Sequence, residues 1–362
     1  MVTPRYFPSV GGVETHVAQV ATRVAAAGHD VTVLTTDVTG RLPPYEQREG
    51  VTIRRLAAWP GQRDWNISPG IYSEVRRGAW DVVHIQSYHT AVAPLAMLAA
   101  ARSGIPYVVT FHGGCHSSRV RHRFRRVQLA ALRPLLARAA ALVAVAPFEL
   151  DLYGSRLHLP RGRFVLIPNG ADLPPAGATP RGARNGALIA SVGRLERYKG
   201  HQHVLLALPH VLRRRPDTRL WIGGSGPYEP VLRELAAELG VADRVDIHAV
   251  PPENRQQLAD ELTAADVVVL ASEFETHPVA AIEAAALGRP VVVADNSGLH
   301  DLVEQGVARA VSDERDPAEL AVAILDELRH PTVPRAGELP SWDDCASRLC
   351  DLYARVAADA AP

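Results

Sequence analysis

The sequence predicts an α/β fold in which helices cover parallel strands on both faces. Short runs rich in Val and Ile alternate with helix-length segments along the whole chain. Most runs are apolar at every position, which is typical of strands buried on both faces, and the alternation with helices predicts βαβ units in doubly wound sheets. The expected strands are residues 31–36, 81–86, 107–111, 141–146, 164–167, 188–193, 220–223, 245–248, 267–271 and 291–294.

Chain length and a proline-rich stretch predict two such domains. A chain of 362 residues is too long for one ordinary core. Residues 169–186 are rich in proline and glycine and have no apolar period, as expected of a linker. We therefore expect an N-terminal domain over 1–168 and a C-terminal domain over 187–340. A helical apolar pattern marks 341–362, and this helix either closes the second domain or crosses back to the first.

The N-terminus leaves very little room for a first strand. Only residues 1–3 precede Pro4, and the turn Gly11-Gly12 follows shortly afterwards. A strand before a glycine turn usually has about 5–6 residues. Either this strand is very short, or the true start of the protein lies upstream of Met1. The helix expected after Gly12 would offer free N–H groups to an anion, although a tight turn explains the two glycines equally well.

Composition excludes several classes of protein. The formal net charge is zero, so charge gives no argument for a nucleic-acid partner. The three cysteines form neither a disulfide framework nor a CxxC metal site, and we expect free thiols. No apolar run reaches the length of a membrane span, and the N-terminus lacks a secretory pattern. A cytoplasmic protein is therefore expected.

Two glutamates bracket the end of one expected strand. Glu275 follows the strand 267–271, and Glu283 lies in a helix-like stretch that ends near Gly288. In open α/β sheets, ligands bind at the carboxyl ends of the strands. Carboxylates accept hydrogen bonds, so the pair suits a ligand rich in hydroxyls, such as a sugar and a ribose. Taken alone, the two residues also fit a solvated helix start, where the macrodipole favours Glu.

Cations and glycines follow other strands of the second domain. Arg194 and Lys199 follow the strand 188–193, where a guanidinium fork and an ammonium are suited to phosphate oxygens. A basic surface loop is the alternative. Gly224 belongs to the glycine-rich loop after 220–223, which either approaches a nucleotide or is a flexible turn.

A histidine ends a strand of the first domain. His112 follows the strand 107–111 and precedes two glycines. A lone histidine is more often structural, but the end of a strand beside glycines favours a functional role about as strongly.

Together these motifs resemble one family. Six motifs occur in the order seen in the retaining glycosyltransferases of family 4, which they resemble. They are the run Gly11–Glu14, Phe-His-Gly at 111–113, Ile-Pro-Asn-Gly-Ala-Asp at 167–172, Gly-Arg-Leu at 193–195 with Lys-Gly at 199–200, Gly-Gly-Ser-Gly-Pro at 223–227, and the two glutamates. The resemblance spans nearly the whole chain and is strongest from 168 to 294. It implies the GT-B fold, in which two Rossmann-like, doubly wound domains face each other across a cleft.

The resemblance also implies roles for the second domain. That domain would bind a UDP-, GDP- or dTDP-sugar, and the first domain would largely bind the acceptor, which is a small molecule, a glycan or a lipid-linked molecule. Arg194 and Lys199 would neutralise the diphosphate, Glu283 would accept the ribose hydroxyls, and Glu275 would hold the donor sugar near its reacting centre. Fixed cations would lower the barrier to departure of the nucleoside diphosphate.

Further contacts follow from the same resemblance. Gly12 would contact the donor phosphates or sugar across the cleft, and His112 would lie near the reacting carbon. Donor contacts are also implied at Gly224, His277, Pro278 and Val279. The chain has no Asp-x-Asp pattern, and we expect no metal and no other cofactor. Retention is expected through same-face attack, with the leaving phosphate helping to deprotonate the acceptor, in preference to Glu275 acting as a covalent nucleophile.

The chain departs from the family where the donor sugar would bind. Family members often have Gly-Phe-Gly after the first Glu, whereas Thr276-His277-Pro278 stands here. Because proline has no N–H, one backbone donor to the sugar is missing. We expect this position to alter the choice of sugar. A Ser that commonly follows the strand at 141–146 is also replaced, by Ala146-Pro147.

One basic segment stands apart from these motifs. Residues 116–126 (HSSRVRHRFRR) form either a solvated helix face or a contact with a phosphorylated acceptor or an anionic membrane surface. The last of these would place the protein peripherally at the inner membrane face.

Two other functions stay open. One is a different GT-B enzyme, such as a sugar-nucleotide epimerase or a phosphorylase. The other is a non-catalytic nucleotide-sugar-binding protein. A nicotinamide dehydrogenase fits poorly, because no GxGxxG follows the first strand.

Overall fold

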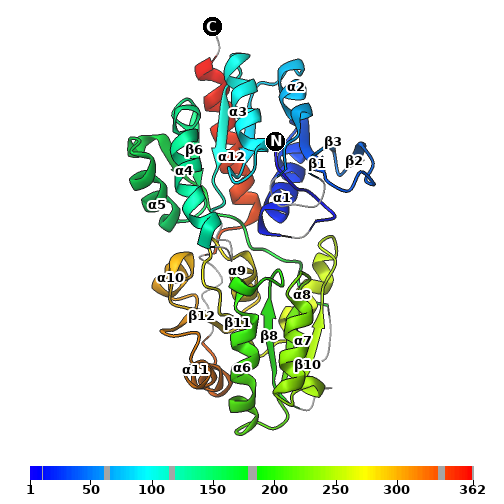
Figure 1. The fold of residues 1–362 in the computed structure, drawn as a ribbon, viewed down its shortest axis with the longest axis vertical. Coiled ribbons are helices and arrows are strands. Elements are labelled where there is room, and N and C mark those ends of the chain that lie inside the picture. The colour runs from blue at the N-terminus through cyan, green and yellow to red at the C-terminus, as the bar shows by residue number, and fades with distance from the viewer. Residues whose placement is uncertain (10, 61–65, 114–118, 178–185, 333–338, 361–362) are drawn as a thin grey trace. The chain divides into compact units, whose positions relative to one another are not determined.

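The computed structural model describes residues 1–9, 11–60, 66–113, 119–177, 186–332 and 339–360. The chain divides into two compact units (Figure 1). The first contains Met1–Gly170 together with Ser341–Pro362, and the second contains Ala171–Pro340. Each unit is built on its own largely parallel sheet.

The sheet of the first unit has two parts. In one part β1 (Val31–Asp37) pairs in parallel with β3 (Val51–Ala57), and β2 (Tyr45–Arg48) pairs antiparallel with β3 at the edge. The other part is parallel and runs in the order β4 (Val83–Gln86), β5 (Tyr107–Thr110), β6 (Ala141–Ala144) and β7 (Phe164–Leu166). Strands β4, β5 and β6 are buried at every position, so both faces of this part are covered.

The first residues of the chain join these two parts. Val2 bridges in parallel to Leu34 on one side and to Ile85 on the other. The N–H of Val2 donates to the carbonyl of His84 at 2.7 Å, and the N–H of Leu34 donates to the carbonyl of Met1 at 2.8 Å. The short stretch before Pro4 therefore acts as a strand between β1 and β4, and its brevity does not prevent it from pairing on both edges.

Helices cover the first sheet, and the last of them comes from the end of the chain. They are α1 (Gly12–Ala26), α2 (Pro69–Arg77), α3 (Val92–Arg102), α4 (Arg119–Leu136), α5 (Pro147–Leu157), the short 3-10 helix η1 (Arg161–Arg163) and α12 (Trp342–Ala360). Helix α12 packs on α1, where Arg23 Nε lies 2.5 Å from Asp343 Oδ1 (Figure 1). Its Tyr353 hydroxyl lies 2.5 Å from Nδ1 of His84 on β4.

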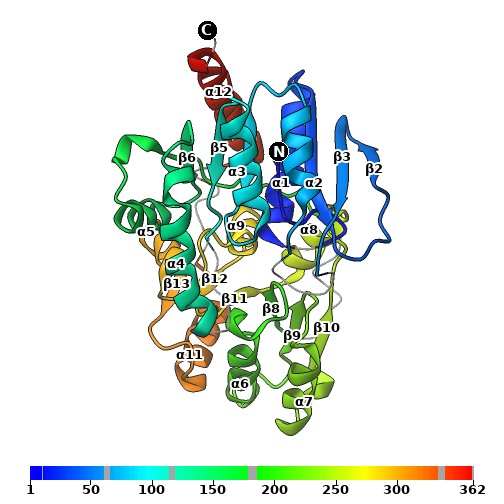
Figure 2. The same ribbon diagram turned by 45° about the horizontal axis from the view of Figure 1, so that its top comes forward.

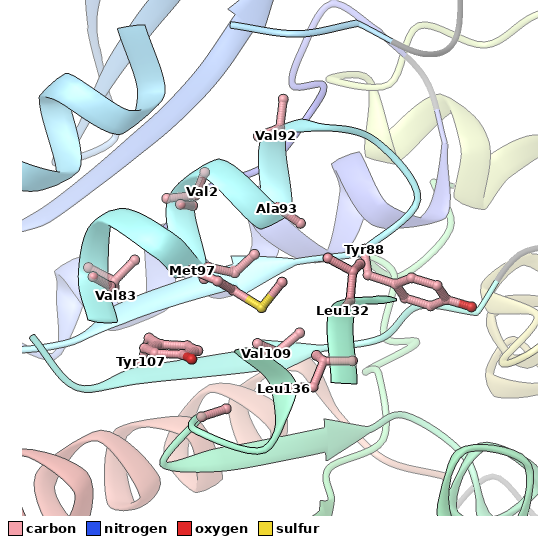
Figure 3. Close-up of a cluster of buried hydrophobic side chains, with 14 of the residues drawn as sticks. Val2, Val83, Tyr88, Val92, Ala93, Met97, Tyr107, Val109, Leu132 and Leu136 are labelled. Atoms are coloured by element: carbon pink, nitrogen blue, oxygen red, sulfur yellow. The ribbon is translucent and has the colours of Figure 1, made fainter. Parts of the chain in front are cut away.

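An apolar cluster lies between this sheet and helices α2 to α5. Figure 3 shows part of it, including Val2 from the N-terminal strand, Met97 from α3, Val109 from β5 and Leu136 from α4. All four are at most 1% exposed. Because the N-terminal strand contributes to this core as well as to the sheet, residues 1–3 are integral to the unit.

The second unit contains one parallel sheet. Its strands are β8 (Leu188–Val192), β9 (Arg219–Gly223), β10 (Val245–His248), β11 (Val267–Leu270), β12 (Val291–Ala294) and β13 (Arg309–Val311). Their order in the sheet is β10-β9-β8-β11-β12-β13. Figure 2 shows β8, β9 and β10 side by side. After β10 the chain returns to the other edge of β8, so the order reverses between β8 and β11, where open α/β sheets bind ligands.

The helices of the second unit follow its strands. They are the 3-10 helix η3 (Arg197–Lys199), α6 (His201–Leu212), α7 (Glu229–Glu238), the 3-10 helix η4 (Ala242–Arg244), α8 (Arg255–Ala264), α9 (Val279–Ala286), α10 (Ser297–Glu304) and α11 (Pro317–Arg329). The four central strands of the sheet are buried almost throughout, as expected when helices lie on both faces.

The expected strands are all present, and the residues that the structure describes contain three strands that the sequence did not predict. Strand β2 is polar and partly exposed, so it carries no apolar signal. Strand β3 contains Arg54 and Arg55 in its centre, and β13 has only three residues. Each of these three strands lacks the continuous apolar run that marked the others.

The stretch expected to be a linker, residues 169–186, is partly built into the second unit. Ala171 is buried in an apolar cluster of that unit. The N–H of Gly177 donates to Asp260 Oδ1 at 2.7 Å, and Gln256 donates to the carbonyl of Pro175 at 2.9 Å. Residues 171–177 therefore pack on α8, and 178–185 lie outside the described residues.

Within the described part of the chain, none of the helices has both the length and the apolar character needed to cross a membrane.

Replacing Trp342 by Ala tests the attachment of α12 to the first unit. The side chain is fully buried, so its removal should lower the free energy of unfolding by about 3–5 kcal/mol. Denaturant unfolding followed by circular dichroism measures this loss. Trp59→Ala is the matched control, because Trp59 is 71% exposed and its removal should change stability little. Equal stability of the two variants would show that α12 is not anchored in this way.

Candidate functional site

The loop after β8 places two cations around one tyrosine. Arg194 donates to the Tyr198 hydroxyl at 2.8 Å and pairs with Glu196 at 2.6 Å. The ammonium of Lys199 lies 5.3 Å from the centre of the Tyr198 ring. An aromatic face attracts a nearby cation, so Tyr198 helps to fix both charges at the end of the strand.

Lys199 also joins this loop to the loop after β11. Its Nζ lies 2.6 Å from Oε1 of Glu275, and the two side chains are only 18% and 12% exposed. Burial is the largest effect and disfavours the charged lysine, but the charge and hydrogen bond of Glu275, together with Tyr198, outweigh burial, so the pKa of Lys199 is raised. A full positive charge is therefore held between β8 and β11, where the strand order reverses.

Two glycines allow these loops to approach closely. Gly200 has a φ of +75°, and a Cβ there would lie 1.7 Å from the carbonyl oxygen of Ala271. A Cβ on Gly224 would lie 1.9 Å from the carbonyl oxygen of Gly193. The first approach seats the β8 loop against the end of β11. The second brings the β9 loop against the β8 loop, so Gly224 has a packing reason to be glycine.

A buried histidine supports the same loop. The Nε2–H of His201 donates to the carbonyl of Arg194 at 3.3 Å, because a carbonyl only accepts. Its Nδ1 therefore accepts from the hydroxyl of Ser191, 2.9 Å away. Burial, together with the charge of Lys199, lowers the pKa of His201 to about 4, so the ring is neutral at neutral pH.

Glu283 forms a second buried pair. It lies on α9, is 3% exposed, and its Oε1 accepts from Arg255 at 2.6 Å. Burial raises the pKa of Glu283, while Arg255 acts in the opposite direction. The two glutamates are therefore held by different cations, Glu275 by Lys199 and Glu283 by Arg255.

The segment between the two glutamates starts α9. His277 is half-buried, Pro278 is buried and caps the helix, and Val279 is its first residue. Because Pro278 lacks an N–H, the first backbone donor of this helix start comes from Val279.

In the first unit, His112 lies in a network of buried polar groups. Its φ is +44°, and its Nε2–H donates to Oε1 of Gln86 at 2.7 Å. The ring meets His16 edge to face with 4.5 Å between centroids, and His16 Nδ1 lies 2.8 Å from Asn169 Oδ1. Burial lowers the pKa of His16 to about 4, so it too is neutral at neutral pH.

The loop after His112 is held by a buried carboxyl. Glu149 accepts from the N–H of Gly113 at 2.5 Å and from the N–H of Val145 at 2.8 Å. Burial raises the pKa of Glu149 to about 7 against the effect of these two donors. Gly12, the first residue of α1, is exposed, and a Cβ there would meet no atom within 4 Å.

The structure thus gathers only part of the expected site in one place. Within the second unit it brings Lys199 and Glu275 into contact and sets Arg194 beside them. Gly12 and His112 belong to the first unit. In the basic segment 116–126, residues 116–118 lie outside the described residues and the side chains of 119–126 are not described.

Sequence reasoning missed several residues that hold the expected ones. Ser272 donates to Glu275 Oε1 at 2.8 Å, Ser297 accepts from the N–H of Glu275 at 2.9 Å, and Asn296 donates to the carbonyl of Ser272 at 3.1 Å. All three follow strands β11 and β12 at the carboxyl edge of the sheet, which was the available signal. Arg255, on α8, had no comparable signal.

No group of three His, Cys, Asp or Glu side chains suited to a metal ion occurs in the ranges that the structure describes.

Comparison with known families covers both units. The family described as Glycosyltransferase Family 4 matches residues 10–174, and the family described as Glycosyl transferases group 1 matches residues 181–336. The D-inositol 3-phosphate glycosyltransferase of Xylanimonas cellulosilytica is 30% identical, over 96% of this chain and 92% of that protein. The protein of the same name from Thermobispora bispora is 29% identical, over 95% and 89%.

Solved structures agree on the fold. Sucrose-phosphate synthase from Thermosynechococcus elongatus superposes with a TM-score of 0.82 at 22% identity, covering 99% of this chain and 98% of that one. Anabaena HepE in complex with UDP and glucose gives 0.77 at 17% identity, covering 98% of each chain. Two doubly wound units, matches to both halves and full-length relatives lead to one conclusion: the chain belongs to the group 1 glycosyltransferases, enzymes with the GT-B fold.

Proposed function

We propose that this protein is a retaining glycosyltransferase of family 4 that moves a sugar from a nucleotide-diphosphate sugar to an acceptor hydroxyl without a metal ion. The observation that carries this proposal is the Lys199–Glu275 pair between β8 and β11. It sets a fixed cation and a carboxylate side by side where open α/β sheets bind ligands. The cation is suited to bind a diphosphate, and the carboxylate is suited to accept a hydrogen bond from a sugar hydroxyl.

Lys199 and Arg194 are proposed to bind the diphosphate. The raised pKa of Lys199 keeps its ammonium charged at neutral pH. An ammonium has three donors, so Lys199 can keep Glu275 and still donate to a phosphate oxygen. Negative charge grows on the phosphate as the nucleoside diphosphate leaves, and a cation already in place stabilises it without reorganisation.

The two glutamates are proposed to bind hydroxyls of the donor. Lys199 and Ser272 both bond Oε1 of Glu275, so Oε2 is the oxygen we assign to the donor sugar. Glu283 is assigned to the ribose, with Arg255 as the cation paired with it in its buried position. Further donor contacts are assigned to Gly224, His277, Pro278 and Val279, which follow strands β9 and β11 at the carboxyl edge of the sheet. We assign Thr276-His277-Pro278 to the choice of sugar.

The acceptor is assigned to the first unit. Of the residues in that unit, Gly12 is assigned to the donor phosphates or sugar and His112 to the reacting carbon. The relatives named D-inositol 3-phosphate glycosyltransferase suggest a phosphorylated polyol as the first acceptor class to test. The basic segment 116–126 is a candidate for its phosphate. HepE was solved with UDP and glucose, so UDP-glucose is the first donor to test.

A donor screen comes before any variant. UDP-, GDP- and dTDP-sugars are compared by thermal shift, because a ligand that binds only the folded state raises the melting temperature. The best donor is then used in a form whose sugar group carries a label. Transfer of the label to a second molecule supports the proposal. Conversion of the donor into another nucleotide sugar supports an epimerase. Release of the labelled sugar as a sugar phosphate in the presence of inorganic phosphate supports a phosphorylase. Saturable binding of the donor without turnover supports a non-catalytic protein.

Removing the charges of the site should abolish transfer. We expect Lys199→Ala, Glu275→Ala and Arg194→Ala each to lower kcat/KM at least about 100-fold, since each removes a group that meets developing charge or the sugar. Initial rates with the labelled donor measure this. Arg233→Ala is the matched control, because the Arg233 side chain is more than half exposed and pairs with Glu229 one turn away on α7. Wild-type rates in any two of the three site variants would refute the assignment.

Replacing Arg255 by Met should make donor binding more sensitive to acid. Without the guanidinium, burial raises the pKa of Glu283 further, so the carboxylate is protonated at a higher pH. Donor affinity should therefore fall below that of the wild type as the pH is lowered, and it should recover as the pH rises. Titration calorimetry between pH 6 and pH 9 measures the shift. Arg255→Lys should retain most of the affinity, and parallel profiles for the Arg255→Met variant and the wild type would contradict the role of Arg255.

A further inference from the structure

Ser297 adopts a backbone conformation with a positive φ, which residues other than glycine seldom adopt. It is the first residue of α10, separated from the end of β12 by two residues, and its φ is +46°. Residues with a Cβ are strained in this left-handed region, and such strain persists where the surrounding structure compensates for it. The contacts of Ser297 show what that compensation is.

The Ser297 hydroxyl lies within a chain of hydrogen bonds that ends at Glu275. The N–H of Glu275 donates to Ser297 Oγ at 2.9 Å, and the Ser297 hydroxyl donates to Asn296 Oδ1 at 2.9 Å. Asn296 Nδ2 then donates to the carbonyl of Ser272 at 3.1 Å. A hydroxyl can accept and donate at once, so every bond in this chain has a consistent direction.

The residue after Ser297 holds the other backbone group of Glu275. The N–H of Gly298 donates to the carbonyl of Glu275 at 2.9 Å. A Cβ on Gly298 would lie 1.9 Å from the carbonyl oxygen of Thr276, so the turn before α10 lies directly against the Glu275 backbone. The left-handed turn at Ser297 is what brings these two successive residues to the N–H and the carbonyl.

The side chain of Glu275 is fixed by the opposite loop. Lys199 and the Ser272 hydroxyl both bond Oε1, at 2.6 and 2.8 Å. Glu275 is thus held at its N–H, its carbonyl and one carboxylate oxygen by residues that follow three different strands, β8, β11 and β12. Ser297 accepts the hydrogen bond from the Glu275 N–H through its side chain, and this contact does not require Ser297 to touch the substrate.

We propose that Ser297 is a positioning residue for Glu275: its hydroxyl fixes the Glu275 backbone, so that Oε2, the carboxylate oxygen assigned to the donor sugar, keeps its orientation. The catalytic part of this inference rests on the proposed function. A plain turn at position 297 would be served better by glycine, which takes a positive φ without strain. Ser297→Gly therefore separates the two interpretations, because it keeps the turn and removes only the hydroxyl.

The first test measures the contact without any activity. Hydrogen exchange by mass spectrometry is followed in a peptide containing Glu275. We expect the Glu275 amide to exchange at least about tenfold faster in Ser297→Gly than in the wild type, because its acceptor is gone. Ser297→Asn should restore protection, since Asn tolerates a positive φ and carries an acceptor oxygen. Unchanged exchange in Ser297→Gly would overturn the contact.

The second test measures catalysis with the best donor of the UDP-, GDP- and dTDP-sugar screen. We expect Ser297→Gly to lower kcat about tenfold or more with a smaller change in KM, and Ser297→Asn to recover part of kcat. His158→Gly is the matched control, because His158 has a φ of +51° at the exposed end of α5. That variant should unfold at a higher denaturant concentration than the wild type and keep its kcat.

The outcomes separate the inference from the function on which it rests. Faster exchange with wild-type kcat in Ser297→Gly would overturn the positioning role while leaving the proposed function intact. A wild-type protein that turns over none of these donors would overturn the proposed function and the catalytic role of Ser297 together. In that case faster exchange in Ser297→Gly would still support the contact with Glu275.

Discussion

The buried ion pair between Lys199 and Glu275 is the interaction on which the second unit's site depends. It links loops that leave β8 and β11, neighbouring strands far apart in the sequence. Two buried charges are costly to desolvate, and their attraction offsets that cost only when the geometry is good and further hydrogen bonds are made. Ser272, Tyr198 and the backbone turn at Ser297 supply those further contacts. The pair is therefore inseparable from its surroundings.

That geometry depends in turn on where the backbone lacks side chains. Gly200 lies under the carbonyl of Ala271, and Gly298 lies under the carbonyl of Thr276. Each approach is shorter than any Cβ would permit. The loops after β8, β11 and β12 are thus pressed together at their backbones, and the charged groups occupy the space that remains. The positions of the charged side chains are therefore fixed by the close packing of the backbone in these loops.

Much of this arrangement could be predicted from the sequence, for a definite reason. Parallel strands buried on both faces leave continuous apolar runs, and residues that follow such runs share one edge of the sheet. Arg194, Lys199 and Glu275 were found in that way. The pairing of Glu283 with Arg255 could not be found, because it joins the first residue of α8 to a residue of α9 and no spacing in the sequence relates the two. Ser297 shares the position after a strand that marked the other site residues, but its contact with the Glu275 backbone depends on a positive φ, which the residue type does not reveal.

The missed strands and the domain boundary have a similar explanation. Strands β2 and β3 form an edge of the sheet with polar residues on it, so periodicity gave no warning of them. Residues 171–177 have the composition of a linker, yet their backbone groups bond to α8. A high content of proline and glycine predicts a segment without regular structure, but it does not predict which other residues the segment will contact.

The route of the chain has a consequence for how the protein is made. The first unit contains residues from both ends of the chain, with the second unit inserted between Gly170 and Ser341. Trp342 is fully buried in the first unit, and its backbone lies so close to Gly170 that a Cβ on that glycine would come within 2.1 Å. On the ribosome, the second unit is complete while the first still lacks α12. The unit that begins synthesis is therefore the last to close its core.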